Sequence, residues 1–364
     1  MLQMKTPAQL QESIERFKKC LWDRAIADRP PVAIAPKDIW LPIKYLRKPF
    51  AKSDVVPDDL RSSPAMTDYE FAFAKKAVTC DDFIPFCAPW RAIPWLEAIS
   101  GCTVRYSIGS LAPVPFAKSA ADLCDVPIPA KNDWLQCMIK QLAVLGSNLP
   151  ADCWLSPTIL RGPSDVLAAM RGLSDFCCDL IDNPAEIDQA AARINRLLLD
   201  CLDEHFSHVK PKLAGYGNIF GYWAPQKTIV IQEDVLGLCS PARYRDIFQK
   251  YNAEIVNRLG GCVFFHLHST GYAHYKNVLA LTGLAGVQIT VEANGPSLLD
   301  MLPDLQTIIE KSRLILYAEH FFEQLPQVLR KLPKTGLYLI LPDTFIKTDD
   351  QFTKFVKILW RQDS

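Results

Sequence analysis

The sequence predicts an α/β protein whose parallel strands close into a (β/α)8 TIM barrel, and two observations carry this prediction. Four short apolar runs rich in β-forming residues recur about 22 to 28 residues apart, with helical patterns between them. They are residues 262–268, 286–292, 313–319 and 336–342. The runs are almost continuously apolar, which is typical of parallel strands that are covered on both faces.

Four earlier runs raise the number of candidate strands to eight, the number that a closed barrel requires. They are VAIAP at 32–36, DDFIPFC at 81–87, CWLSPTI at 153–159 and TIVIQED at 228–234. Their spacing is irregular, so we expect insertions of about 30 to 50 residues in the early strand-to-helix loops. An open doubly wound sheet is the alternative, but neither a G-x-G-x-x-G fingerprint nor a G-x-x-x-x-G-K-[ST] phosphate loop occurs.

Helix start signals place an amphipathic helix at the N-terminus and two further helices later in the chain. Thr6 and Pro7 form the expected start of the first helix, which belongs to an N-terminal extension over residues 1–28. The same pairing of a capping residue with proline predicts helix starts at Asn183–Pro184 and at Ser240–Pro241.

Composition narrows the class of protein. We expect one domain over residues 1–364, in which 40 Lys and Arg balance 40 Asp and Glu, so no net field attracts nucleic acid or an anionic membrane surface. The chain shows neither a secretory signal nor an apolar run long enough to span a bilayer. Most of the 12 cysteines lie inside apolar runs, as free thiols do, which favours a reducing cytoplasm, and the absence of C-x-x-C spacing argues against a zinc ribbon or a thioredoxin-like redox site. We therefore expect a soluble cytoplasmic protein, and a homodimer is compatible with these features.

Polar side chains follow the predicted strands at the end where such a barrel assembles its chemistry. His266 and His268 are two residues apart, so in a strand both imidazoles point the same way and could bind one metal ion. Zinc would need a third ligand from another strand end, and the candidates are Glu319, Glu292, His320 and Asp343. Hydrogen-bonded structure and substrate contact are the alternatives for the histidine pair.

The adjacent carboxylates Glu233 and Asp234 end the fourth predicted strand. Neighbouring strand residues face opposite sides, so at most one of the two faces the barrel mouth. We take Glu233 as the catalytic candidate, which could act as a general base or hold a cationic substrate group. The alternative is that Asp234 caps the following helix and Glu233 is an ordinary ion-pair partner.

A further set of residues is predicted to contact the substrate. Tyr222 and Trp223 belong to the aromatic segment GYGNIFGYWAP at 215–225, which could form a flat wall for a planar or methylated ligand, or else pack onto the barrel. Arginines near strand ends could bind carboxylates bidentately. The other candidates at the strand ends are Trp90, Arg91, Arg161, Gln232 and Glu292.

The run EDVLGLCSPARYRDIFQKYNAEIVNRLGGCVFFHLHSTG resembles the central segment of the uroporphyrinogen decarboxylase superfamily. The positions that match are Glu233, Asp234, Ser240, Pro241 and His266. DNPAEIDQAAARINRLL is similar to the Pro-Glu helix of that family, and PWLEAISGC is similar to a segment of its methyltransferase-like branch. The resemblance covers the chain from residue 80 onward and implies a (β/α)8 barrel with a deep cleft.

Two departures from the family pattern bear on the reaction. True uroporphyrinogen decarboxylases carry an Arg-rich stretch after the first strand that binds the substrate's carboxylates, whereas this chain has KDIWLPIKYLRKP at 37–49. The corrinoid-linked methyltransferases of the superfamily hold zinc with His-x-Cys and a later Cys. Here His268 replaces the first Cys, and Asp343 follows the last strand without a cysteine. His266, His268 and a carboxylate could still form a zinc site.

The resemblance, with these departures, implies metal-assisted methyl transfer or demethylation of a small methylated substrate, with zinc in the site and a corrinoid protein as partner. One alternative is cofactor-free decarboxylation of uroporphyrinogen or a similar polycarboxylate in tetrapyrrole synthesis, with Arg91 or Arg161 holding carboxylates. A second alternative is a non-catalytic barrel that binds a tetrapyrrole or a small methylated compound.

Overall fold

A computed structural model gives the fold of most of the chain. It describes residues 4–35, 54–60, 78–91, 93–107, 110–125, 132–344 and 346–360. The stretch 37–49, where the sequence departs from the Arg-rich pattern, lies outside these ranges. Within them, no helix combines the length and the apolar character that crossing a membrane requires.

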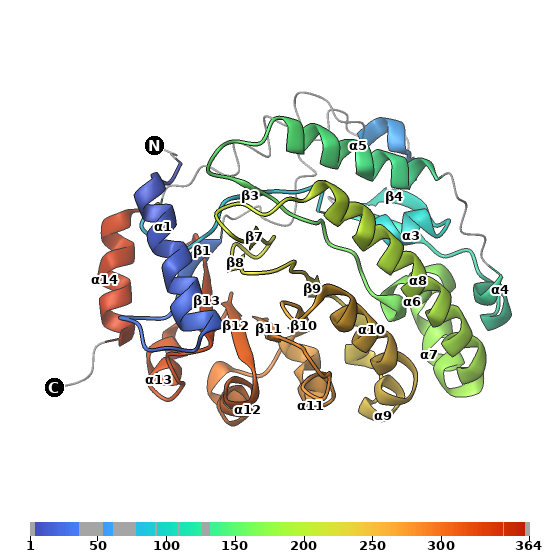
Figure 1. Cartoon of the computed structure of the whole chain (residues 1–364). Helices are drawn as coiled ribbons and strands as arrows, with labels where there is room; N and C mark the ends of the chain where they lie inside the picture. The colour runs from blue at the N-terminus through green and yellow to red at the C-terminus, as the bar shows by residue number, and fades with distance from the viewer. Residues whose placement is uncertain are drawn as a thin grey trace.

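Six parallel strands form the main sheet (Figure 1). Their order across the sheet is β1 (Val32–Ala35), β13 (Leu337–Pro342), β12 (Arg313–Ala318), β11 (Gly286–Val291), β10 (Phe264–His268) and β9 (Val230–Ile231). Every neighbouring pair in this sheet is parallel. Six of the eight predicted strands are therefore confirmed, including all four in the last hundred residues.

A two-stranded parallel ladder supplies the other two predicted strands. In it β3 (Phe86–Cys87) pairs with β6 (Trp154–Leu155). Two backbone hydrogen bonds of 2.7 Å link residues near this pair to the two edges of the main sheet. The Asp82 N–H donates to the Val32 carbonyl at the β1 edge, and the Gly162 N–H donates to the Gln232 carbonyl at the β9 edge. The ladders of the described residues form two separate parallel sheets, and they do not join into one closed ring.

Side chains alternate between two hydrophobic clusters on the two faces of the main sheet. On β10, Phe265 and Leu267 pack in the outer cluster with helix residues such as Ile255, whereas Phe264 packs in the inner cluster with Tyr338. Both faces are thus removed from water, which explains why the strands are apolar at almost every position.

The helices divide between the two clusters: those that follow β9 to β13 cover the outer face of the sheet (Figure 1), whereas the N-terminal helix packs Leu10 and Ile14 into the inner cluster. The longer ones are α1 (Pro7–Arg16), α5 (Asp133–Ser147), α6 (Pro163–Arg171), α7 (Leu173–Asp182), α8 (Pro184–His208), α10 (Gln249–Leu259), α12 (Leu298–Lys311) and α14 (Asp349–Trp360). The shorter ones are α3 (Trp95–Ile99), α4 (Ala120–Cys124), α9 (Pro241–Arg243), α11 (Tyr275–Val278) and α13 (Leu325–Leu329).

The predicted helix starts are confirmed, with one difference in capping. Thr6 and Ser240 each accept a backbone hydrogen bond at the start of α1 and α9. α8 begins at Pro184 as predicted, but Asn183 does not cap it. The Asn183 amide donates to Asp179 at 2.8 Å instead, because α7 ends immediately before this residue and offers a nearer acceptor.

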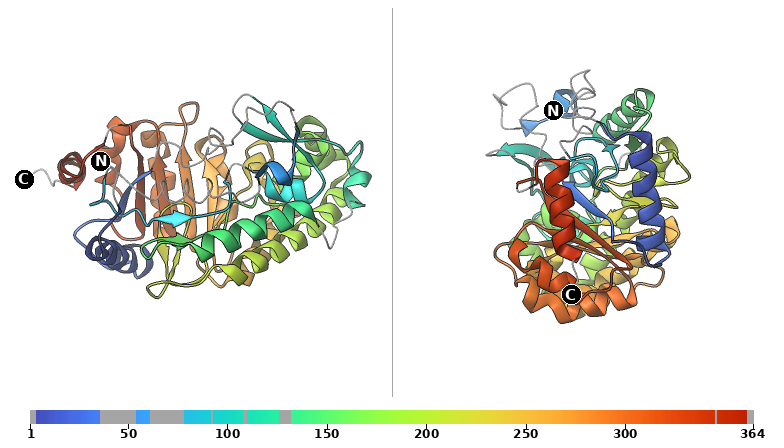
Figure 2. Two further views of the ribbon diagram at one scale, coloured as in Figure 1. Left: turned by 90° about the horizontal axis from the view of Figure 1, so that it is seen from above. Right: turned by 90° about the vertical axis from the view of Figure 1, so that its left-hand side faces the viewer.

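The largest early insertion lies between β3 and β6. It contains α3, α4, α5 and two strands, β4 (Thr103–Ser107) and β5 (Ser110–Val114). These strands form an antiparallel sheet with β2 (Asp54–Val55), in the order β2, β4, β5. Figure 2 shows that this small sheet lies at the opposite end of the elongated molecule from α1 and α14.

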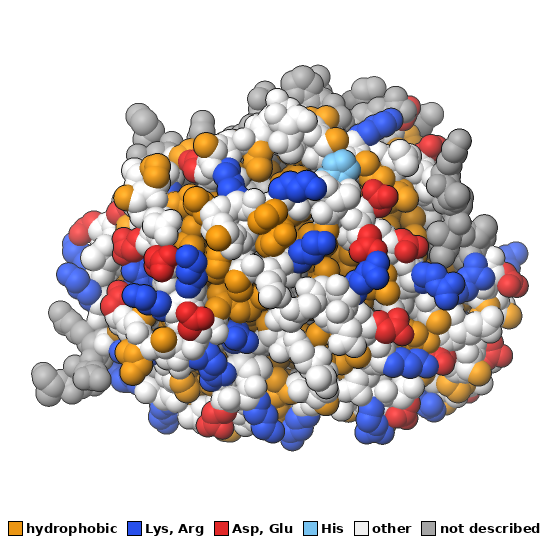
Figure 3. Space-filling view, viewed as in Figure 1, with side chains coloured by type: hydrophobic (Ala, Val, Ile, Leu, Met, Phe, Trp, Pro, Cys, Tyr) orange, Lys and Arg blue, Asp and Glu red, His pale blue; other side chains and the backbone are white. Residues whose placement is uncertain are grey.

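Basic and acidic side chains are interspersed on the face seen in Figure 3, with hydrophobic side chains between them near the centre. This mixture agrees with the equal numbers of basic and acidic residues in the sequence. No field of one sign covers this face, as the composition predicts.

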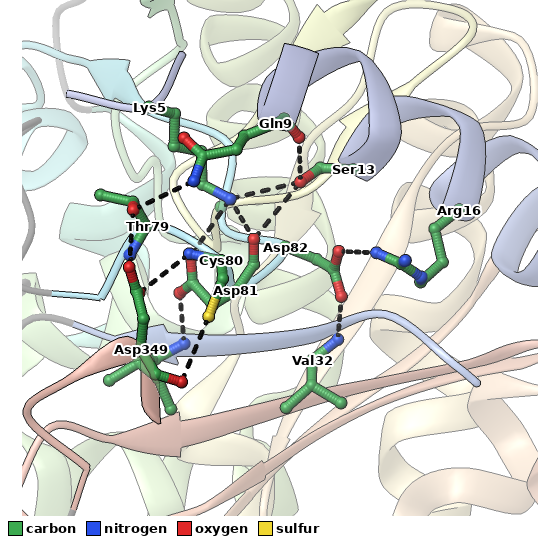
Figure 4. A network of polar contacts seen from close by, with 12 residues as sticks. Lys5, Gln9, Ser13, Arg16, Val32, Thr79, Cys80, Asp81, Asp82 and Asp349 are labelled. Carbon is green, nitrogen blue, oxygen red and sulfur yellow. Dashed lines mark hydrogen bonds and ion pairs between the residues drawn. The ribbon is translucent and has the colours of Figure 1, made fainter. Parts of the chain in front are cut away.

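Two buried carboxylates satisfy the free edge of β1 (Figure 4). The N–H of Val32 donates to Asp82 Oδ2 and the N–H of Ile34 donates to Asp81 Oδ2, both at 2.8 Å. These backbone donors have no ladder partner on the side away from β13. A buried N–H must have an acceptor, and the two carboxylates accept the hydrogen bonds that a neighbouring strand would otherwise accept.

Cations from the N-terminal segment neutralise both carboxylates. Arg16 and Arg29 form ion pairs with Asp82, and Lys5 Nζ lies 3.2 Å from Asp81 Oδ1. Both aspartates are at most 1% exposed, where an unpaired charge would be costly. The network thereby attaches α1 to the edge of the sheet.

Replacing Asp82 by alanine is expected to lower the free energy of unfolding by about 3 to 5 kcal/mol, because two nearly buried guanidinium groups and the Val32 N–H lose the buried carboxylate that they share. Urea denaturation followed by circular dichroism measures this loss. Glu12→Ala is the control: it removes an exposed partner of the same Arg16 and should cost less than about 0.5 kcal/mol. Equal losses in the two variants would show that the buried network is not what holds this edge.

Candidate functional site

The candidate site lies where three neighbouring strands end. His266 on β10 pairs with Gln288 in the parallel register of β10 and β11. On the other side of β10, β9 leads to Asp234, the first residue of a short 3-10 helix, η4 (Asp234–Leu238). His266 and His268 are two residues apart on one strand, so both side chains point into the same space.

Asp234 and the two histidines form a compact cluster. Nε2 of His268 lies 3.4 Å from Asp234 Oδ1, and Nε2 of His266 lies 3.7 Å from the same oxygen. One ligand atom from each of the three residues falls within 4.8 Å of the others. The two rings meet edge to face with their centroids 4.5 Å apart. Within the described ranges, this is the one group of three or more such side chains close enough to share a metal ion.

Residues of β11 and the loop after it engage the other nitrogen of each ring. Nδ1 of His266 is hydrogen-bonded to Gln288 Oε1, and the Gln288 amide nitrogen donates to Thr290 at 3.1 Å. Because the amide oxygen accepts, His266 carries its proton on Nδ1 and turns the Nε2 lone pair toward Asp234. Nδ1 of His268 lies 3.1 Å from Glu292 Oε1.

Glu292 is itself held in place on two sides. Its Oε2 accepts a hydrogen bond from the Thr270 hydroxyl at 3.0 Å, and its backbone N–H donates to the buried Ser269 hydroxyl at 2.9 Å. The carboxylate is therefore positioned beside His268 before any ligand arrives.

The two imidazoles have opposite pKa shifts although their rings touch. Burial lowers the pKa of His266, and the charge of Asp234 only partly opposes this. The contact with Asp234 raises the pKa of His268 against partial burial, and Glu292 adds to the rise. Burial would raise the pKa of Asp234, but the two histidines outweigh it and hold that pKa below its usual value. His268 is thus the stronger base of the pair.

A cavity of about 200 Å³ opens beside the cluster. Its charged and titratable wall includes Asp234, Glu292 and both histidines, while Leu236 and other apolar or small residues complete the lining. None of the described residues that line this cavity is Lys or Arg.

Glu233, the carboxylate predicted to be catalytic, faces away from the histidines. It accepts hydrogen bonds from the Ser164 N–H at 2.8 Å, at the start of α6, and from Asn252 on α10 at 2.7 Å. Burial raises its pKa to about 7. The two adjacent carboxylates face opposite sides, as neighbouring strand residues do, and Asp234 is the one beside the histidines while Glu233 lies in the helix layer.

Hydrogen bonds orient Asp234 from both sides. Its backbone N–H donates to Asp165 at 3.0 Å, and the N–H of Val235 donates to the same carboxylate at 2.8 Å. Gln232, a predicted substrate contact, donates to Asp234 Oδ2 at 2.7 Å. Oδ2 is therefore occupied, and Oδ1 is the oxygen that faces the histidines.

Three other predicted metal ligands, Glu319, His320 and Asp343, do not join the cluster. Glu319 follows β12 and Asp343 follows β13, which are separated from β10 by β11. Both carboxylates lie near Tyr317, whose pKa is raised by burial and by these two charges. Glu292 does contact His268, on its Nδ1 side. The strand order thus explains which carboxylates reach the histidines.

Tyr222 and Trp223 lie at the opposite, amino-terminal end of the strands. The Tyr222 ring packs 5.4 Å from that of Phe264, at the start of β10, and its hydroxyl is hydrogen-bonded to Thr228 at 2.7 Å. The Trp223 carbonyl accepts from Trp22 at 2.7 Å. Both side chains are buried in the inner core, so the predicted substrate wall is structural packing.

The remaining predicted substrate contacts, Trp90, Arg91 and Arg161, are not among the described residues that line the cavity. Trp90 and Arg91 follow β3 and are buried, with the Arg91 guanidinium 5.4 Å from the Phe86 ring centre. Arg161 bridges to Gln232 and forms a 2.6 Å ion pair with Glu97.

The sequence did not predict that Asp234 lies beside the histidines or that Gln288 contacts His266. Asp234 was considered as a helix cap, yet it ends the strand that precedes the histidine strand, and consecutive strands of a parallel sheet are usually neighbours. Gln288 is a polar residue inside an otherwise apolar strand, GVQITV, where a buried amide needs a specific partner.

Comparison with known proteins identifies a solved structure with a similar fold. A methyltransferase from Methanosarcina mazei aligns with this chain at a TM-score of 0.59 and 13% sequence identity, and the alignment covers 98% of each chain. Neither the protein-family models nor the curated protein sequences contain a match. The chain therefore shares the overall α/β fold of that enzyme.

In the metal-free protein we expect His266 to titrate below, and His268 above, the ordinary imidazole pKa of about 6.5. The raised pKa of His268 contributes stability that is fully present below about pH 6.5 and is lost as the pH rises through its folded-state pKa. Asp234→Asn should lower both pKa values, since it removes the shared negative charge. Proton NMR titration of chelator-treated protein measures them, and the reverse order of the two pKa values would contradict the assignment.

Proposed function

We propose that the protein is a metal-dependent methyltransferase of the uroporphyrinogen decarboxylase superfamily, which moves a methyl group from a small methylated substrate to a corrinoid protein. One observation carries the proposal: each imidazole is engaged at Nδ1, and both Nε2 atoms face the same oxygen of Asp234. This is the arrangement of histidines prepared for a metal ion. The fold of a known methyltransferase and the sequence resemblance support the reaction class.

The donor set fits a divalent metal ion. Zinc binds imidazole nitrogen and carboxylate oxygen at about 2.0 to 2.2 Å, so ligand atoms of a tetrahedral site lie about 3.3 Å apart. The distances from Asp234 Oδ1 to the two Nε2 atoms, 3.4 and 3.7 Å, are close to this separation. His266, His268 and Asp234 would hold the ion, and the adjacent cavity leaves room for a substrate atom.

A metal ion held there would supply Lewis acidity, which polarises the methyl-bearing heteroatom and makes it a better leaving group. The contribution of the chain itself is orientation. Gln288 and Glu292 keep the Nε2 atoms of both rings directed at the cluster, and their contacts with Nδ1 increase the basicity of the ligands. Gln232 fixes the second oxygen of Asp234.

The architecture that we propose for this enzyme is a (β/α)8 barrel. Two observations support this architecture. The described residues form eight parallel strands, six in the main sheet and two in the β3–β6 pair, and backbone hydrogen bonds link residues near the β3–β6 pair to both edges of the main sheet. The cluster lies at the carboxyl ends of the strands, where barrels of this type have their active sites. The corrinoid partner rests on the sequence resemblance.

Decarboxylation of a polycarboxylate has less support. Its substrate would need several cationic side chains, and the described residues that line the cavity include none. Asp234 and Glu292 would instead repel carboxylates. Arg161, one of the two arginines that this alternative assigns to the substrate, is already paired with the buried Glu97.

Protein purified without chelator or histidine tag should contain about one zinc ion per chain, as measured by mass spectrometry, and the His266→Ala, His268→Ala double variant should contain none. Gln288→Leu should weaken zinc binding about 10- to 100-fold, because His266 loses its orienting partner. Glu319→Ala and Asp343→Ala are the controls and should bind zinc normally. Zinc that is retained in the double variant, or lost in the controls, would place the metal elsewhere.

With a reduced corrinoid protein as acceptor and small methylated amines, ethers and thiols as donors, the zinc-loaded protein should form methylcorrinoid, which is detected by absorbance. The double histidine variant should be at least about 100-fold slower, since Lewis-acid assistance is worth several kcal/mol. Uroporphyrinogen should release no CO2. Release of CO2 without methyl transfer would replace the proposal by the decarboxylase, and tight binding without turnover would favour the binding barrel.

A further inference from the structure

Two cysteine side chains meet on the outer face of the short β3–β6 pair. Sγ of Cys87, the last residue of β3, lies 3.2 Å from Sγ of Cys153, which immediately precedes β6. Both cysteines are buried in the outer cluster, whereas Phe86 and Trp154, their neighbours along the chain, pack in the inner cluster. The sulfur atoms of a disulfide are about 2.05 Å apart, so these two need to approach by only about 1 Å.

An ammonium group lies beside this pair of thiols. Nζ of Lys212 donates to the carbonyl oxygens of Pro150 and Cys153, at 2.8 and 2.9 Å. Burial lowers the pKa of Lys212, and its attraction to Cys153, Asp152 and Cys87 opposes this shift. A positive charge next to a thiol favours the thiolate, which is the form that reacts with oxidants. The pair therefore has the surroundings of a reactive thiol.

A strained turn packs against the chain at the start of β6. Lys212 and Gly215 exchange backbone hydrogen bonds of 2.7 and 3.1 Å, and the indole N–H of Trp154 contacts both of their carbonyls. Between them, Leu213 and Ala214 have φ values of 46° and 56°, as in a type I′ turn, where Asn-Gly is the favoured pair. Leucine and alanine are strained in this left-handed region. The turn thus opens more readily than a turn with suitable residues.

We propose that Cys87 and Cys153 form a reversible disulfide when a hydroperoxide enters past the opened turn at 212–215. The Cys153 thiolate attacks one peroxide oxygen, the bond between the two oxygens breaks, and the departing oxygen takes up the proton that the thiol had lost. The sulfur becomes a sulfenic acid. The Cys87 thiol then attacks this sulfur, and its proton leaves with the hydroxyl group as water. The two sulfurs lose two electrons, which the peroxide gains.

This disulfide would join the two ends of the largest insertion. Residues 88–152 lie between the two cysteines and include α3, α4, α5, β4 and β5. The ladder that holds these ends together pairs only two residues of each strand. A cross-link that closes such a long loop restricts the unfolded chain, so the oxidised protein should resist unfolding better than the reduced protein. The proposed metal site plays no part in this inference.

The test begins with fully reduced protein that is treated with hydrogen peroxide, blocked with iodoacetamide, digested and analysed by mass spectrometry. We expect a peptide that links Cys87 to Cys153 and that disappears after dithiothreitol treatment. Oxidation should raise the urea concentration at the midpoint of unfolding, and Cys87→Ser should abolish this rise. Cys178→Ser is the matched control: it removes an exposed thiol and should leave the cross-link unchanged.

Three further variants test the assigned roles. In Cys87→Ser, dimedone should label Cys153 as the sulfenic acid, because the second thiol is missing. Lys212→Met should slow the cross-link at least about 5-fold, whereas Lys212→Arg, which keeps the positive charge, should retain the native rate. Leu213→Asn combined with Ala214→Gly supplies the favoured turn pair, so it should also slow the reaction by keeping the turn closed. Circular dichroism verifies that each variant is folded.

Two kinds of result would overturn the inference. The first is that peroxide oxidises other cysteines while Cys87 and Cys153 remain unlinked in the native protein. The second is that the cross-link forms at the native rate both in Lys212→Met and in the variant with the Asn-Gly turn, since neither the ammonium group nor the turn would then control the reaction.

Discussion

The parallel alignment of β9, β10 and β11 is the constraint on which the site depends. Parallel strands end at one edge of a sheet, so the residues at and after their ends converge although they are far apart in the chain. Asp234, the histidine pair and Glu292 meet in this way. The alternation of side chains along each strand then selects which of these residues face the cavity and which face the helices.

The parallel sheet is stable only if the backbone donors at its β1 edge have acceptors and both of its faces are covered by apolar side chains. At β1, the carboxylates of Asp81 and Asp82 accept the backbone donors that lack a ladder partner, and three cations from the N-terminal segment neutralise them. The N-terminal helix is therefore part of what keeps the sheet intact, since it carries Arg16. Aspartates occur both at this edge and at the carboxyl ends of the strands. Those at the edge are paired with lysine and arginine, whereas Asp234 lies beside histidines.

The difference between the two carboxylate sets is informative. Asp81 and Asp82 have lysine and arginine partners that permanently balance their charges. Asp234 and Glu292 instead contact the imidazoles of His266 and His268, whose charge depends on pH. The charges of the first set are balanced by permanently charged or strongly basic side chains, whereas the charge beside the second set changes with pH. The neighbouring Glu233 belongs to neither set, because it ties β9 to α6 and α10.

The sequence by itself determined the strands, the helix starts and the fact that His266 and His268 share a face, because periodicity and capping are local properties that a few consecutive residues express. It also indicated that one of two adjacent carboxylates points inward. Only the tertiary structure decided that this one is Asp234, that Gln288 orients His266, that Glu319 and Asp343 lie elsewhere, and that Tyr222 is core. The position of each of these residues depends on which strands are neighbours in the sheet and on the end of the strands at which a loop packs. The spacing of residues along the chain determines neither of these.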